Sequence, residues 1–110
     1  MWSKLLRVSK VEKIWCDEVR ELGSIISGKH PVEIHHCAGR AAKHNKIHVG
    51  IFWILPLTKA EHDSVPTWAH GRKEREKWLF ARLILKYRRV YGRDIPFDEC
   101  VAKAIQDYHK

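Results

Sequence analysis

Apolar residues in the first quarter of the chain recur at the three- and four-residue spacing of a helix. Ser9 and Glu12 have the form of a capping box, and Gly23 is typical of a helix stop. The pattern therefore predicts a helix over about 10–22. Its buried stripe would hold five side chains: Val11, Ile14, Trp15, Val19 and Leu22.

Short β-branched runs follow this helix. Residues 24–27 and 32–36 flank a turn-forming segment at 28–31, which predicts a β-hairpin. Residues 38–50 are small, polar and basic, and predict an exposed loop. Residues 51–55 are apolar throughout and predict a buried strand.

The C-terminal half has the pattern of three helices. The strand at 51–55 is broken by Pro56, and residues 58–61 again have the form of a capping box, which opens a short helix that Pro66 should end. Residues 72–91 carry a wide apolar face and predict the longest helix. Pro96 is expected to open the last one.

Composition narrows the class of protein. With 110 residues, 45% of them hydrophobic, the chain suits one α+β domain over 9–110 after a short basic lead-in over 1–8. The formal net charge of +8 favours a polyanionic partner, nucleic acid first, although ribosomal and membrane-surface proteins share this balance. Three cysteines without a Cys-x-x-Cys pair favour a reducing cytoplasm. With no signal-peptide core and no membrane-spanning run, we expect a soluble, cytoplasmic protein without a membrane partner.

Four histidines stand at the ends of the predicted strands and helices. His35 and His36 end an alternating apolar run, and His62 and His70 follow the second apolar run. Histidine is both the commonest metal ligand and the usual general base. Phosphodiester hydrolysis with one metal needs ligands and a separate neutral base. Three ligands and one base would account for these four side chains, on a hairpin followed by a helix.

The same residues resemble a known family. The chain has Glu33-Ile34-His35-His36-Cys37, then Ile54-Leu55-Pro56-Leu57-Thr58, then His62 and His70-Gly71 before the long helix. This order resembles the HNH, or ββα-metal, endonuclease superfamily, and within it the phage nucleases of the Ref type (recombination enhancement function). The similarity covers roughly residues 12–92. It implies a ββα-metal core with an N-terminal helix and two C-terminal helices.

The resemblance also implies roles for the histidines. His36 would be the general base, while His35, His62 and His70 would bind a divalent metal, Zn²⁺ or Mg²⁺. Adjacent strand residues face opposite sides, so His35 and His36 converge only if the strand ends or twists at Cys37. The family further implies a phage or prophage origin, a bacterial host cell, a link to DNA recombination, and RecA-coated DNA as a candidate partner.

Two departures from the family pattern stand out. The family's Cys-x-x-Cys hairpin appears here as Ser24-Ile25-Ile26-Ser27, and serine supplies no thiolate for a structural zinc. The hairpin would then be held by packing. The central Asn of the HNH motif is also absent, with Trp53 or its neighbours near its place.

Basic residues form two candidate DNA-binding sets. One lies in the predicted loop: Arg40, Lys43 and Lys46. The other shares one face of the long helix, where an ordinary solvated face is the alternative: Arg75, Arg82, Lys86 and Arg89.

The leading hypothesis is a metal-dependent endonuclease that hydrolyses DNA phosphodiester bonds. A non-catalytic, zinc-stabilised DNA-binding protein derived from the same fold is the first alternative. A basic helical adaptor without metal is the second.

Overall fold

The computed structural model describes the backbone of residues 2–108 and the side chains from Lys10 to Tyr108. It is an α+β protein with four helices and two small antiparallel sheets in this part of the chain. The first sheet pairs β1 (Glu33–His36) with β4 (Ile54–Leu57). The second is a hairpin of β2 (Lys43–His44) and β3 (Ile47–His48).

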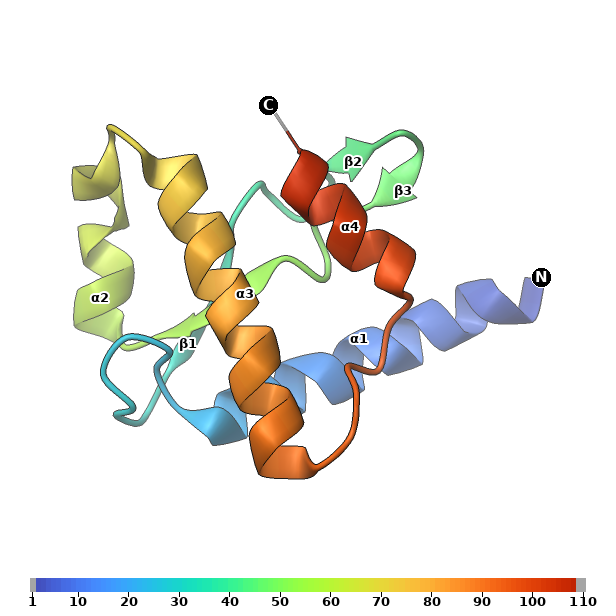
Figure 1. The fold of residues 1–110 in the computed structure, drawn as a ribbon, viewed down its shortest axis with the longest axis horizontal. Coiled ribbons are helices and arrows are strands. Elements are labelled where there is room, and N and C mark those ends of the chain that lie inside the picture. Colours follow the sequence, from blue (N-terminus) through green and yellow to red (C-terminus); the bar gives the residue numbers. More distant parts are fainter. Residues whose placement is uncertain (1, 109–110) are drawn as a thin grey trace.

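The helices surround the first sheet (Figure 1). Helix α1 (Trp2–Leu22) and helix α3 (Arg72–Tyr91) both pack on β4, and the short α2 (Lys59–Ser64) lies against β1 and β4. Helix α4 (Glu99–Asp107) lies over the β2–β3 hairpin. No described helix is both long enough and apolar enough to cross a membrane.

The N-terminal helix is longer than its sequence pattern predicts. It begins at Trp2 and runs through Ser9, so the predicted capping box at Ser9 and Glu12 is wrong. Residues 2–8, predicted as a lead-in, belong to this helix, while Met1 lies outside the described residues. The physical reason is that the segment before Ser9 contains no Gly or Pro, so nothing in it stops a helix.

The partner of β1 also differs from the prediction. Residues 24–27 form a turn, and β1 pairs instead with β4, with Ile34 opposite Pro56. Proline fits within β4 because its carbonyl faces outward and accepts a hydrogen bond from the Ile25 amide at 3.1 Å. The buried strand is therefore 54–57 and not 51–55.

The segment predicted as an exposed loop contains the β2–β3 hairpin. Asn45 and Lys46 adopt positive φ angles of 51° and 66°, which a two-residue hairpin turn requires. Asparagine tolerates that conformation, so it is the local signal for this hairpin.

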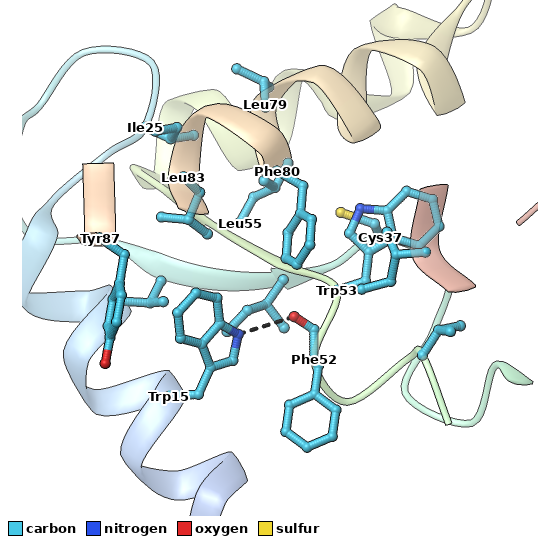
Figure 2. Packing of buried hydrophobic residues seen from close by; sticks show 14 of the residues in the cluster. Trp15, Ile25, Cys37, Phe52, Trp53, Leu55, Leu79, Phe80, Leu83 and Tyr87 are labelled. Atoms are coloured by element: carbon cyan, nitrogen blue, oxygen red, sulfur yellow. Dashed lines mark hydrogen bonds between the residues drawn. The ribbon is translucent and has the colours of Figure 1, made fainter. Parts of the chain in front are cut away.

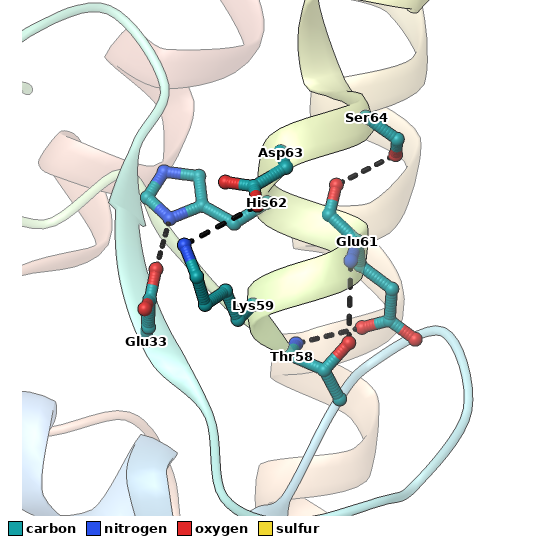
Figure 3. Close-up of polar contacts among 7 residues, drawn as sticks. All are labelled: Glu33, Thr58, Lys59, Glu61, His62, Asp63 and Ser64. Carbon is teal, nitrogen blue, oxygen red and sulfur yellow. Dashed lines mark hydrogen bonds and ion pairs between the residues drawn. The ribbon is translucent and has the colours of Figure 1, made fainter.

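The C-terminal elements largely follow their sequence signals. Thr58 and Glu61 form the predicted capping box at the start of α2 (Figure 3). Helix α2 ends at Ser64, and a 3₁₀ helix, η1 (Val65–Trp68), takes in Pro66. Helix α4 begins at Glu99 and not at Pro96, because the Asp98 side chain accepts a hydrogen bond from the Cys100 amide at 2.9 Å and caps it.

The core lies between α1, α3 and the first sheet (Figure 2). Trp15 of α1 is fully buried, and its indole Nε1 donates to the Phe52 carbonyl at 3.0 Å. Its ring centroid lies 5.1 Å from that of Tyr87 and 5.0 Å from that of Phe97. This packing fixes the position of β4 between α1 and α3, and the pairing of β1 with β4 fixes the position of β1 as well.

Candidate metal centre

Alternate residues at the end of β1 face α3. His35 and Cys37 lie on this face, and His35 Nε2 stands 2.6 Å from Oε2 of Glu76 on α3. Their exposed fractions are 6% for His35, 8% for Cys37 and 3% for Glu76. One ligand atom from each of the three lies within 4.8 Å of the others. This buried group could hold a metal ion, and imidazole, thiolate and carboxylate are the donors that zinc takes in proteins.

The electrostatics of the group suit a cation. Burial raises the pKa of the Cys37 thiol well above its ordinary value, and the neighbouring Glu76 carboxylate raises it further. The Arg72 guanidinium, whose Nε lies 3.2 Å from Glu76 Oε2, opposes that shift. The thiol therefore keeps its proton unless another positive charge replaces it.

The group lies at the side of an open hollow. Cys37 and Glu76 line this pocket of about 450 Å³, together with Arg72, Lys73 and Trp53. Trp53 is 1% exposed, and its indole Nε1 is buried without a hydrogen-bond partner among the described residues. An unpaired buried donor is a site where a bound anion or a thiolate would be stabilised.

His62 is brought close to His35, as the sequence predicts. Their ring centroids are 5.1 Å apart at an interplanar angle of 66°. His62 Nδ1 also lies 2.7 Å from Oε1 of Glu33, the first residue of β1 (Figure 3). His62 is not a member of the three-donor group found in the described part of the chain.

His36 lies on the opposite face of β1. It lines a shallow hollow on the α1 side with Glu12, Cys16 and Arg40. Burial lowers the pKa of its imidazole, and the Arg40 charge lowers it further. Its Nε2 is buried and has no hydrogen-bond partner within residues 10–108. Both histidines lie within β1, which ends at His36, so they point to opposite sides of the strand: His35 contacts α3 and His36 faces α1.

His70 is exposed in the turn between η1 and α3, and it makes no hydrogen bond or ion pair with another described residue. Its neighbours Ala69 and Gly71 line the hollow beside Cys37 and Glu76.

Hydrogen bonds hold the turn where the resembling family has cysteines. Ser24 Oγ donates to Glu61 Oε1 at 2.6 Å and accepts from the amides of Ile26 and Ser27 at 3.0 Å each. A serine-centred turn thus ties residues 24–27 to the start of α2, the helix that carries His62.

The predicted DNA-binding residues divide by their contacts. Arg40 is paired with Glu12 of α1, and the Lys86 ammonium donates to the Leu22 carbonyl at 3.0 Å. Two further arginines lie over tryptophan rings. The Arg75 guanidinium carbon is 4.3 Å from the centroid of the Trp68 ring, and the Arg82 guanidinium carbon is 5.0 Å from that of Trp78. Three others are exposed at the surface: Lys43, Lys46 and Arg89.

From the sequence, Glu76 was not identified as a member of this group, and Cys37 ranked below the histidines as a metal ligand. A signal for Glu76 existed, because it lies three and four positions before Leu79 and Phe80 on the apolar stripe of α3. A carboxylate on a buried stripe requires a partner. Cys37 could have been found from its position two residues after His35 on the same strand face.

Comparisons of the chain with protein-family models, with curated proteins and with solved structures find no match.

Proposed function

We propose that the chain is a metal-dependent endonuclease that hydrolyses DNA phosphodiester bonds with a single ion on a ββα-metal core. The observation that carries the proposal is the unit formed by β1, its antiparallel partner β4 and the helix α2 that follows β4, in which the ring centroids of His35 and His62 lie 5.1 Å apart. A strand–strand–helix unit with facing histidines is the arrangement that the sequence resemblance implies.

His35 is the anchor of the metal in this proposal, with His62 and His70 as the further ligands that the resemblance suggests. A divalent ion there would neutralise charge that develops on the scissile phosphate. The hollow lined by Cys37 and Glu76 also has Arg72 and Lys73 in its lining, and these cations would orient a phosphate.

His36 is the proposed general base. Its lowered pKa keeps the imidazole unprotonated at neutral pH, as proton transfer from water requires. Because the His36 ring faces α1, the reacting water would have to lie near the end of β1 for His36 to take its proton.

DNA is the proposed partner because of the charge of the surface. The net charge is +8, and exposed lysines and arginines lie on the β2–β3 hairpin and on α3. The resemblance extends the proposal to a phage or prophage nuclease that acts in the bacterial cytoplasm during recombination, on RecA-coated DNA.

A second candidate function is a non-catalytic, metal-stabilised DNA-binding protein. One observation favours it, namely that His36 and the buried His35 group lie on opposite faces of β1. Such a protein would bind metal and DNA but would not cut.

Nicking of supercoiled plasmid in Mg²⁺, Mn²⁺ or Zn²⁺ tests the proposal. Wild-type protein should nick in at least one metal, and chelation should abolish nicking. His36→Ala should lower the rate by about 100-fold or more, as expected for loss of a general base. The control is His48→Ala, an exposed histidine of β3. DNA binding without nicking in any metal would favour the second candidate, and equal nicking by His36→Ala would remove His36 from the role of base.

A further inference from the structure

We propose that His35, Cys37 and Glu76 form one metal site with nitrogen, sulfur and oxygen donors, and that this site takes zinc in preference to magnesium. The site shares only His35 with the three-histidine set that the sequence resemblance implies. The role of the ion in DNA cleavage rests on the proposed function, but the existence of the site does not.

The fold brings the three donors together from the end of β1 and from α3. His35 lies in β1, Cys37 directly follows that strand, and Glu76 is 41 positions after His35, on α3. All three are less than a tenth exposed. Rigid packing of β1 against α3 therefore presents the donors within 4.8 Å of one another, before any ion binds.

Charge balance favours a divalent ion at this place. A thiolate and a carboxylate carry two negative charges, and a neutral imidazole carries none, so a divalent cation would make the buried group neutral. A thiolate at Cys37, buried beside the Glu76 carboxylate, needs a compensating positive charge, and a bound ion would supply it in addition to the Arg72 contact that Glu76 already has.

Neighbouring groups are positioned to support the ligands. Arg72 Nε lies 3.2 Å from Glu76 Oε2 and would fix the orientation of that carboxylate. Trp53 lies beside Cys37 in the core and lines the same hollow, and its indole N–H has no partner among the described residues (Figure 2). That donor is available to a metal-bound sulfur or oxygen atom.

The hollow leaves room for a fourth ligand. Three protein ligands with one open position distinguish catalytic zinc sites from closed structural ones. Two of the three donors, Cys37 and Glu76, line the pocket of about 450 Å³, and Arg72 also lies in its lining. Water or a phosphate oxygen would take the fourth position.

The thiolate determines which metal binds. Magnesium requires oxygen ligands in octahedral geometry, whereas sulfur and imidazole ligands suit zinc and cobalt. A site that contains Cys37 should therefore bind no magnesium at concentrations that saturate sites made of oxygen ligands alone.

Titration of the metal-free full chain with Co²⁺, under anaerobic conditions and without DNA, tests the site. We expect binding of one equivalent, with a near-ultraviolet thiolate-to-cobalt absorption band that Zn²⁺ removes and Mg²⁺ does not. Loss of an outer-shell partner alone costs about 10–100-fold in metal affinity, so Cys37→Ser and Glu76→Gln should each weaken binding at least that much. Cys37→Ser should also abolish the band.

Matched variants keep the test decisive if Cys37→Ser does not fold. The double variant Cys16→Ser with Cys100→Ser leaves Cys37 as the sole thiol, and it should keep both the band and the stoichiometry. The three-histidine set of the resemblance is the competing ligand set for an ion on His35, and His62→Ala and His70→Ala separate the two: the band persists in both variants if Cys37 and Glu76 complete the site. The proposal is overturned if the double variant loses the band, if Cys37→Ser keeps it, or if His62→Ala abolishes binding. Plasmid nicking is scored separately, so a protein with the band but no nicking contradicts only the proposed function.

Discussion

His35 Nε2 and Glu76 Oε2 lie 2.6 Å apart between β1 and α3, and both side chains are buried. This contact joins the strand that carries the histidine pair to the longest helix of the C-terminal half. It also places a carboxylate where the sequence pattern of α3 calls for an apolar side chain.

Removal of that carboxylate should destabilise the metal-free protein. Glu76→Ala would leave His35 and Arg72 without their shared acceptor, and a buried polar group left unpaired, here the His35 imidazole, costs about 1–3 kcal/mol in the free energy of unfolding. Urea unfolding measures the change. The control is Glu74→Ala on the exposed side of the same helix, for which a change within about 0.5 kcal/mol is expected. Equal effects of the two substitutions would show that the His35–Glu76 contact contributes little.

The capping box of α2 should stabilise the helix that carries His62. Thr58→Ala removes the side-chain acceptor for the Glu61 amide, at 3.2 Å, and should cost about 1 kcal/mol. Lys59→Ala, which breaks only an exposed pair with Asp63, should change the free energy of unfolding by less than about 0.5 kcal/mol. Thermal or urea unfolding of both variants tests this, and a larger loss for Lys59→Ala would contradict it.

The raised pKa values of two tyrosines predict that the protein loses stability at alkaline pH. Burial raises the pKa of Tyr87 and of Tyr91 from the ordinary 10.0 to about 12, and their hydrogen bonds to Glu18 and Glu21 contribute to the shift. Because the folded pKa is the higher one, their stabilisation is complete below pH 10.0 and is lost as the pH rises to about 12.

Urea midpoints measured from about pH 9 to about pH 12 should therefore fall in the wild type. The fall should be smaller in the double variant Tyr87→Phe with Tyr91→Phe, and the difference between the two proteins removes the contribution of lysine titration. Parallel curves for the two proteins would refute the assignment to these hydroxyls.

DNA binding should depend on the exposed basic residues and on salt. If Lys46, Arg82 and Arg89 each contact a phosphate, then each alanine substitution should reduce the slope of log affinity against log salt by about 0.9. Lys103→Ala is the control, since this lysine lies on α4 and pairs with Asp107 at 3.7 Å. Fluorescence anisotropy with duplex DNA at several salt concentrations gives the slopes. An equal effect of Lys103→Ala would indicate diffuse attraction without a defined surface.

Local signals predicted the helices better than the strands. The spacing of Trp15 and Val19, the capping box at Thr58 and the stop at Gly92 all act within a few residues, so α1, α2 and α3 could be read from the sequence. The start of α1 was misplaced because Ser9 has the chemistry of a cap but lies inside the helix.

Strand pairing depends on residues far apart in sequence, and there the prediction failed. The partner of β1 is β4, and the segment at 24–27 forms a turn instead. Pro56 looked like a strand breaker, yet only its outward-facing carbonyl is needed for pairing with Ile25.

The candidate site could be predicted only in part. The family resemblance predicts that His35 and His62 lie close together, and their ring centroids are 5.1 Å apart. Glu76 joins His35 only through the packing of α3 on the sheet, which no local pattern encodes. His36 faces α1 and His35 faces α3 because adjacent residues within β1 point to opposite sides of the strand.

Zinc K-edge X-ray absorption of the zinc-loaded full chain tests the central claim, a mixed-donor metal centre at His35, most directly. The account predicts one sulfur ligand at about 2.3 Å together with nitrogen and oxygen ligands at about 2.0–2.2 Å. The sulfur contribution should disappear in Cys37→Ser and persist in Cys100→Ser. A wild-type spectrum with nitrogen and oxygen ligands alone would contradict it.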